Sequence, residues 1–259
     1  MVSSSILSIM ASLFLIVLIF SATSALPHQQ RVKRVVKGSS TSIETIPYQV
    51  ALVVDNFPIC GGSILQENII ITAAHCCCSY LPNDTLIYAG MYNKKEMRNL
   101  KGIRVKDVKI HEKYNYTGDP TPDDIAILVL EEDLVFGPTI GKVGLMEEDF
   151  AVPVNATISG WGSTNCNFSL SNEQACNGWF ATELQSGTLT IQRRENGLIY
   201  APSTEVTGNY GDSGSPVVAN GKLIGIARNC DIVAPNIFDF DATSILDYLP
   251  WIKSTLESI

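Results

Sequence analysis

Basic residues are scarce in this chain. Its 259 residues include 18 Lys or Arg against 26 Asp or Glu, which gives a formal net charge of −8 at pH 7. Three of the basic residues (Arg31, Lys33 and Arg34) lie in a leader of 34 residues without an acid, so the charge of the remaining chain is −11. Binding to nucleic acid requires clustered Lys and Arg that neutralise phosphates. The composition therefore predicts no nucleic-acid partner.

Histidine is scarcer still, with three residues, of which only His75 and His111 follow the leader. Because a general base near neutral pH is most often histidine, these two are the candidates for that role. His111 is followed by Glu112 and Lys113, and we interpret it as solvated surface. His75 follows the apolar run Ile69–Ile71. In such a semi-buried place an orienting carboxylate would matter, which favours His75.

Two motifs are missing. No paired-histidine metal motif is present, and the adjacent cysteines Cys76, Cys77 and Cys78 cannot easily supply tetrahedral zinc ligands. The Gly-x-Ser-x-Gly elbow of the α/β-hydrolases is also missing, which argues against a simple esterase or lipase. We expect no metal and no cofactor. Internal repeats and low-complexity tracts are missing too, and a β domain of 225 residues is commonly a single unit.

The first 25 residues predict a secretory signal peptide. An apolar run, Ile6 to Phe20, is followed by small residues, and cleavage is expected after Ala25. The segment before the run lacks Lys and Arg, so a signal anchor is the alternative. The run is short for a full membrane span, which favours the cleaved peptide.

Residues 26–34 resemble an activation propeptide. A basic cluster ends at Arg34 and directly precedes the apolar pair Val35-Val36, a place where a processing protease would cut. The alternative is a solvated charged patch in a flexible leader. Cleavage would release residues 35–259 even from a membrane anchor, so we expect no stable membrane association after processing. An activating protease is then an expected partner.

Cysteines and glycosylation sequons fit the secretory route. Seven cysteines in a secreted chain imply disulfides and a leftover thiol. Cys60 is expected to pair with Cys76, and Cys166 with Cys176 inside a polar loop, which leaves Cys77, Cys78 and Cys230 unassigned. Four sequons mark expected surface loops; they begin at Asn83, Asn115, Asn155 and Asn167.

Short apolar runs separated by turn residues predict an all-β barrel or sandwich. The runs are Tyr48–Val54, Ser63–Leu65, Ile69–Ile71, Ile125–Leu130, Ala156–Ser159, Gly187–Ile191, Val217–Ala219 and Leu223–Ala227. Only the tail, Ser244 to Glu257, has a helical rhythm of apolar residues. Because Pro250 lies inside that pattern, we expect the helix to begin near it, with proline in the first turn.

Two short motifs carry the chemistry. Gly211-Asp212-Ser213-Gly214-Ser215-Pro216 offers a serine in a glycine-rich loop, and Thr72-Ala73-Ala74-His75-Cys76 offers a base. A serine hydroxyl is almost inert at neutral pH unless a base takes its proton. A tightly turned loop can also aim backbone N–H groups at a developing oxyanion.

With Asp124-Ile125-Ala126-Ile127-Leu128 between them, these motifs resemble the chymotrypsin/trypsin family of serine endopeptidases. The resemblance spans residues 35–259, and weaker matches support it: Pro47–Val50, Cys60–Ser63, Ser159–Gly162 and Trp251-Ile252. The resemblance implies an all-β fold of two six-stranded antiparallel β-barrels of the chymotrypsin type, followed by a C-terminal α-helix.

The resemblance also implies a role for each matching residue. Ser213 attacks the scissile carbonyl, His75 takes its proton, and Asp124 holds His75 in the right tautomer. Asp123 is the competing carboxylate. The oxyanion hole is implied to consist of the backbone N–H groups of Gly211 and Ser213. After cleavage, the new amino terminus at Val35 would pair with Asp212, in the manner of zymogen activation.

Several residues depart from the family pattern around the substrate pocket. Thr207 stands where trypsins place the aspartate that pairs with a substrate Lys or Arg, which predicts a neutral pocket for apolar or small side chains. Asn209 replaces a cysteine that normally braces the pocket. Arg228-Asn229-Cys230 replaces Ser-Trp-Gly; Arg228 could disturb Asp124 unless a one-residue gap places Ala227 at the serine position.

The family's metal site and the expected function complete the comparison with the family pattern. The calcium loop of the trypsins is missing, because Asn93-Lys94-Lys95-Glu96 carries mostly the wrong charge for a hard cation. The expected function is a secreted, extracellular serine endopeptidase, made as a zymogen and monomeric, with protein or peptide substrates and protein inhibitors as partners. The alternative is a serine-protease homologue that binds partners and cuts poorly or not at all.

Overall fold

The structure is a computed structural model, and it describes residues 38–78, 84–115, 122–163, 180–204, 206–234 and 237–259. The expected signal peptide (residues 1–25), the propeptide (26–34) and Val35 lie outside the described residues. So do Cys166, Cys176, Asn83 and Asn167. Their expected roles remain predictions.

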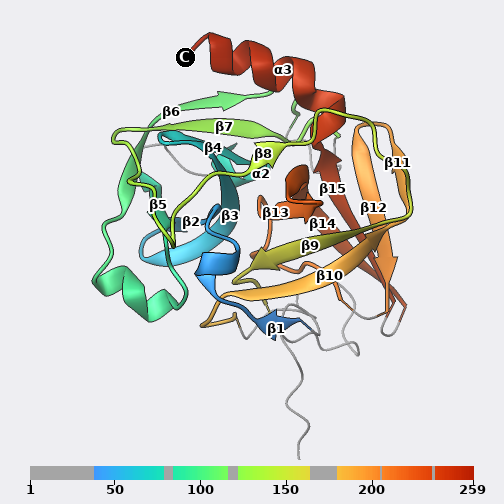
Figure 1. Ribbon diagram of the computed structural model, residues 1–259, viewed down its shortest axis with the longest axis horizontal. Coiled ribbons are helices and arrows are strands. Elements are labelled where there is room, and N and C mark those ends of the chain that lie inside the picture. Colours follow the sequence, from blue (N-terminus) through green and yellow to red (C-terminus); the bar gives the residue numbers. More distant parts are fainter. Residues whose placement is uncertain (1–37, 79–83, 116–121, 164–179, 205, 235–236) are drawn as a thin grey trace, which may run out of the picture. The chain divides into compact units, whose positions relative to one another are not determined.

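The described chain is mostly β-structure, as the apolar runs predict (Figure 1). The strands are β1 (Ser39–Ser40), β2 (Gln49–Val54), β3 (Phe57–Gln66), β4 (Ile69–Thr72), β5 (Leu86–Ala89), β6 (Ile103–Ile110), β7 (Ala126–Leu130), β8 (Gly144–Leu145), β9 (Val154–Gly160), β10 (Gln185–Ile191), β11 (Arg193–Glu195), β12 (Leu198–Ser203), β13 (Pro216–Ala219), β14 (Lys222–Ala234) and β15 (Ile237–Ser244). The helices are η1 (Ile43–Thr45), α2 (His75–Cys78), η3 (Lys94–Arg98) and α3 (Ile245–Glu257).

The first half of the chain forms a closed barrel of six strands in the order β2-β3-β4-β7-β6-β5. Neighbouring strands pair antiparallel throughout. Strands β2, β4 and β7 are buried along their whole length, which agrees with their nearly continuous apolar sequences. The closed barrel carries α2 directly after β4, and it thereby fixes the position of His75.

The second half of the chain, joined by β1 from its start, forms a sheet in the order β1-β10-β9-β13-β14-β15-β12-β11, with β8 pairing with β14 off this path. Its strands β10 and β11 are consecutive in the chain, with only Gln192 between them. The Gln192 N–H donates to the carbonyl of Tyr200 in β12, so the sheet curls back on itself. Its interior holds a separate buried cluster that includes Ile158, Val217 and Phe240. Together with the first barrel, this arrangement confirms the predicted fold class.

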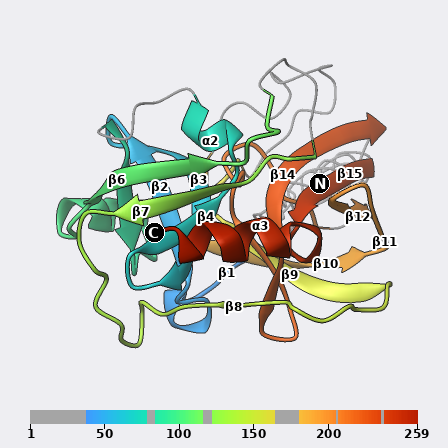
Figure 2. The same ribbon diagram turned by 90° about the horizontal axis from the view of Figure 1, so that it is seen from above.

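Helix α3 begins earlier than the sequence predicts. It runs from Ile245, so Pro250 lies in its interior rather than in its first turn. An interior proline lacks one backbone N–H and costs about 3 kcal/mol. Burial offsets this cost, because Ile245, Tyr248 and Ile252 join the core cluster of the first barrel (Figure 2). Tertiary packing therefore overrides the local preference of proline.

Candidate active site

The side chains of His75 and Asp124 meet between the end of β4 and the start of β7. His75 Nδ1 lies 2.7 Å from Asp124 Oδ2, and the His75 backbone N–H donates to Asp124 Oδ1 over 2.9 Å. Asp124 is buried, whereas His75 is half-buried. Thr243 Oγ1 donates to the Asp124 carbonyl and ties this segment to β15. One carboxylate oxygen therefore holds the backbone of His75, and the other faces Nδ1 of its imidazole ring.

The competing carboxylate, Asp123, has other partners. Its Oδ1 accepts a hydrogen bond from the Tyr248 hydroxyl and lies 3.6 Å from His111 Nδ1. The interpretation of His111 as solvated surface is wrong: the residue is 7% exposed, with its ring packed against Tyr248 and Trp251. The neighbouring charges hid this, because Glu112 and Lys113 are exposed while His111 faces inward below α3. His111 thus belongs to a contact between β6 and α3.

Ser213 lies in the loop before β13, where the two halves of the chain touch. The Gly61 N–H of the first barrel donates to the Ser213 carbonyl over 2.8 Å, and Thr72 Oγ1 donates to the Gly61 carbonyl. This places the serine beside the strand that leads into His75. Among the described residues the Ser213 hydroxyl has no hydrogen-bond partner, and the side chain is half-buried. In proteins without bound substrate, the hydrogen bond between a catalytic nucleophile and its base is often long, and it tightens when substrate binds.

The two glycines that flank Asp212 and Ser213 adopt left-handed backbone conformations. Gly211 has φ = 92° and Gly214 has φ = 78°, a region that side chains other than glycine adopt at a cost. The Gly214 N–H donates to the Ala227 carbonyl, and the Ser215 N–H to the Asp212 carbonyl. The loop is therefore pinned on both sides of Ser213.

Asp212 is buried beneath this loop. Its Oδ1 accepts a hydrogen bond from the Gly162 N–H (2.8 Å) and its Oδ2 one from the Asn209 N–H (3.0 Å). Burial raises the pKa of Asp212 to about 6, against the effect of these donors and of the nearby charge of Lys94. The Asn209 amide donates to the Ser163 carbonyl, so it supplies a non-covalent brace where the family pattern has a cysteine.

The residues expected around the substrate pocket meet one another. Thr207 is fully buried; its hydroxyl donates to the Gly208 carbonyl and lies 3.0 Å from Cys230 Sγ. Burial raises the pKa of the Cys230 thiol to about 12, so it stays protonated. Phe240 packs against the next residue, because a Cβ atom on Gly208 would lie 2.8 Å from Phe240 Cε2. Cys230 and Phe240 are direct partners in the β14–β15 pair.

Arg228 does not disturb Asp124. Strand β14 has an irregularity at this residue, between Ala227 and Asn229. The guanidinium forms a two-pronged ion pair with Asp241 of β15, at 2.6 and 2.7 Å, and both side chains are buried. Buried bidentate pairs of this kind fix the arginine rotamer. The predicted disturbance of Asp124 by Arg228 is therefore avoided, because Asp241 binds the guanidinium instead. Asn229 is half-buried and donates to Asp231.

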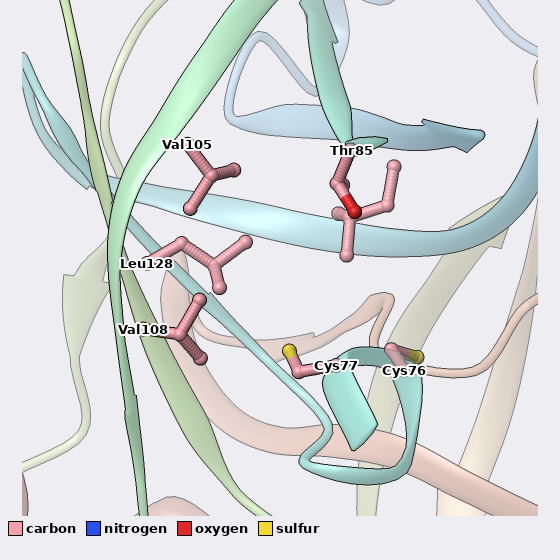
Figure 3. A pocket seen from close by; sticks show the side chains of 7 residues that line it. Cys76, Cys77, Thr85, Val105, Val108 and Leu128 are labelled. Carbon is pink, nitrogen blue, oxygen red and sulfur yellow. The ribbon is translucent and has the colours of Figure 1, made fainter. Parts of the chain in front are cut away.

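The cysteines of α2 do not form a metal site. Sulfur and nitrogen atoms of Cys60, His75 and Cys76 lie close together, but the two sulfurs form the predicted disulfide. Cys77 points the opposite way, into a small apolar pocket lined by Val105, Val108 and Leu128 (Figure 3). Burial raises its pKa to about 12, which makes the thiol a poor nucleophile.

The expected glycosylation sites are partly described. Asn115 and Asn155 are exposed, and Asn155 accepts a hydrogen bond from the Thr190 hydroxyl. Both asparagines are accessible to a modifying enzyme.

Within the described ranges, none of the helices has the length and apolar character needed to span a membrane.

Sequence reasoning missed four residues that shape the site. They are Lys94, Phe180, Phe240 and Asp241. Each acts through a contact between elements distant in sequence, such as Lys94 with Trp161 or Asp241 with Arg228. Two features of the sequence point to them: the alternation of Phe and Asp in Phe238–Asp241, and the presence of Lys94 in the loop that replaces the calcium loop of the trypsins.

Comparisons with known proteins agree over most of the chain. The family model described as Trypsin matches residues 35–252. Trypsin alpha of Drosophila melanogaster is 32% identical over 233 residues, covering 87% of this chain and 89% of the relative. Hypodermin-A of Hypoderma lineatum is 29% identical over 209 residues, covering 74% and 76%. Neuropsin, a serine protease expressed in the limbic system of mouse brain, has a similar fold, with a TM-score of 0.73, 24% identity and coverage of 85% and 99%.

Proposed function

The chain belongs to the trypsin family of serine proteases, and on that premise we propose that it is a secreted endopeptidase made as a zymogen, with non-tryptic specificity. The observation that carries the proposal is the contact of His75 with both oxygens of Asp124, beside the loop that holds Ser213. Other family members are named serine proteases, so protein substrates follow from membership.

In the proposed reaction His75 Nε2 removes the proton of Ser213, whose oxygen adds to the scissile carbonyl. Asp124 holds the other ring nitrogen and stabilises the imidazolium that forms. The backbone N–H groups of Gly211 and Ser213 receive the developing negative charge. The leaving amine takes the proton from His75, and water then hydrolyses the acyl-enzyme by the same steps in reverse.

Zymogen activation is supported by the environment of Asp212. Its carboxyl group is buried with two backbone N–H donors, and a cation would stabilise its ionised form. The family match begins at Val35, the residue that cleavage after Arg34 would expose. We propose that the new amino group binds Asp212 and thereby stabilises the Gly211–Ser213 loop. Residues 1–25 and 26–34 would be removed on the way, and Asn83, Asn115, Asn155 and Asn167 would carry glycans.

Specificity for a small side chain before the scissile bond is supported by the crowding around Thr207. The Thr207 hydroxyl is used by Gly208 and Cys230, so it offers no charge to a substrate Lys or Arg. Phe240 lies against Gly208, and Cys230 lies against the Thr207 hydroxyl. A pocket filled by the protein's own side chains leaves room for glycine, alanine or serine.

Removing the Cys230 side chain should widen this preference. In a peptide-library digest we expect the wild type to cleave after small residues. Cys230→Gly should raise the ratio of kcat/KM for leucine over alanine by about 10-fold, because one or two carbon-sized groups in a pocket are worth ~10–200-fold. The control is Cys230→Ser, which keeps the size and should keep the preference. Strong cleavage after Lys or Arg would contradict the role given to Thr207.

The function itself is tested by active-site labelling. Residues 30–34 are replaced by Asp-Asp-Asp-Asp-Lys, so that enteropeptidase cuts directly before Val35, and the product is treated with a fluorophosphonate probe. We expect a labelled band at the mass of the cut chain only after cleavage, and none with Ser213→Ala. Correctly cut, folded protein that takes no label would instead favour the alternative, a catalytically weak homologue that binds partners such as protein inhibitors. A monomer is proposed in either case.

A further inference from the structure

A lysine far away in sequence is linked to the buried carboxyl group under the serine loop. Lys94, the first residue of η3, donates from Nζ to the Trp161 carbonyl over 3.2 Å. The next N–H, that of Gly162, donates to Asp212 Oδ1 over 2.8 Å. Carbonyl and N–H belong to the same peptide group. A cation, one peptide group and a carboxylate therefore form a continuous chain of hydrogen bonds.

This arrangement strengthens each of its members. A peptide group that accepts from a cation at its carbonyl becomes a better donor at its N–H. In addition, the charges of Lys94 and Asp212 act on one another through buried surroundings, where solvent screens weakly. The ionised form of Asp212, which burial opposes, is thus stabilised by Lys94 through charge and through the Gly162 hydrogen bond.

The same ammonium group also contacts an aromatic side chain at the proposed oxyanion hole. Lys94 Nζ lies 5.1 Å from the centre of the Phe180 ring, a cation–π distance. Phe180 in turn packs against Gly211: a Cβ on Gly211 would lie 2.8 Å from Phe180 Cε1. The Lys94 backbone N–H bonds to the Thr182 carbonyl, which fixes η3 to the Phe180 segment.

Few other titratable groups face this pair within the described parts of the chain. Glu96, in η3, accepts from the N–H groups of Tyr92 and Asn93, and Glu183 accepts from the Ser40 hydroxyl. The Cys230 thiol, which burial keeps protonated, is close enough to Asp212 for the carboxylate to contribute to its raised pKa. The carboxylates near Lys94 are thus occupied by other donors, and Asp212 is the acid whose charge acts on it.

We propose that Lys94 is a positioning residue for the Gly211–Ser213 loop, which it holds in place through the Trp161–Gly162 peptide group and Phe180. The inference rests on the proposed function, because the loop is positioned for acyl transfer. It gives the loop a cation of its own, separate from the amino group that cleavage would supply. Oxyanion stabilisation then depends on the charge of a side chain outside the triad.

The charge of Lys94 links activity to pH. Burial lowers its pKa to about 8, and Asp212 acts in the opposite direction. As the pH rises through 8 the ammonium group loses its proton, Asp212 loses the positive charge that Lys94 supplies, and kcat should fall. The stability of the fold moves the other way: between pH 8 and 10.5 the unfolded chain holds the proton that the folded chain has lost, so unfolding becomes less favourable as pH rises.

The activity test compares Lys94→Met, Lys94→Arg and Lys95→Met. Met keeps the packing on Phe180 but has no charge, and Lys95 is an exposed neighbour in η3. For Lys94→Met we expect kcat to be about 10-fold lower at pH 7 with KM unchanged, a smaller loss than the ~10²–10³ for removing an oxyanion donor itself. The decline of kcat above pH 8 should be smaller than in the wild type, because the contribution of Lys94 is gone. Lys94→Arg should retain kcat and shift the decline to higher pH, since guanidinium stays charged. Wild-type kcat in Lys94→Met would overturn the proposal.

A second readout needs no activity. In the uncut chain carrying Ser213→Ala, the NMR shift of the Gly162 amide should follow the ionisation of Asp212, with a midpoint near pH 6. Lys94→Met should move that midpoint to higher pH and shift the Gly211 amide, whereas Lys95→Met should do neither. An unchanged midpoint overturns the proposal even if the enzyme is active. An inactive wild type would overturn the proposed function, while these amide shifts would still decide the coupling.

Discussion

Asp124→Asn should lower kcat about 10⁴-fold while the protein remains folded, the magnitude known for this change in the family's best-studied member. The physical reason is the tautomer of His75. The His75 backbone N–H needs an acceptor, so the amide oxygen of Asn would face it. The amide NH₂ group would then point at Nδ1, which must lose its proton to accept. The ring proton moves to Nε2, and that nitrogen can no longer take the proton of Ser213.

The neighbouring carboxylate provides a matched control. Asp123→Asn keeps an oxygen that can accept from the Tyr248 hydroxyl, and Asp123 makes no contact with His75 among the described residues. We expect its kcat to stay within about 3-fold of the wild type. Steady-state kinetics measure kcat for both variants, and circular dichroism confirms that both are folded. Equal losses in the two variants would contradict the assignment of Asp124 as the residue that orients the base.

Gly214→Ala should destabilise the fold by about 4 kcal/mol or more and reduce kcat by at least ~10²-fold. A Cβ at this position would clash with the Gly61 carbonyl oxygen and with Thr72 Oγ1. The carbonyl oxygen is backbone of the first barrel and cannot rotate away. The loop that carries Ser213 must shift instead, and a shift of about 1 Å in a reacting group costs ~10²-fold.

Gly221 separates crowding from backbone strain. It has nearly the same left-handed conformation (φ = 72°, against 78° for Gly214), but a Cβ there would meet nothing within 4 Å. Gly221→Ala should therefore show only the conformational cost of about 1–2 kcal/mol. Thermal and denaturant unfolding of the two variants measure the difference. If Gly214→Ala were no worse than Gly221→Ala, the close approach of the two halves would not constrain the loop.

The fold and the core of the candidate site could be predicted because their signals are local. Alternating and continuous apolar runs mark β2, β4 and β7, and the strings around His75 and Ser213 lie within a few residues of the chemistry. Asp124, which the motif favours over Asp123, contacts His75 in the structure, and its role in catalysis stays a prediction. The Cys60–Cys76 pairing followed from the strands that the two cysteines bracket.

Features that depend on contacts between distant segments could not be predicted. The partner of Arg228 is Asp241, thirteen residues away across a strand pair whose register one sequence does not fix. His111 is buried because α3 covers it, although its neighbours are charged. The start of α3 at Ile245 likewise reflects packing on the first barrel, which outweighs the local effect of Pro250.

The hydrogen bond from the Gly61 N–H to the Ser213 carbonyl joins two halves of the chain that each carry part of the candidate site. The proposed base is carried by one half of the molecule and the nucleophile by the other. Neither half alone contains a complete set of reacting groups, so a single half released by proteolysis should have no peptidase activity. A cut that separates the two halves would therefore end the proposed activity, and neither fragment would hydrolyse peptide bonds.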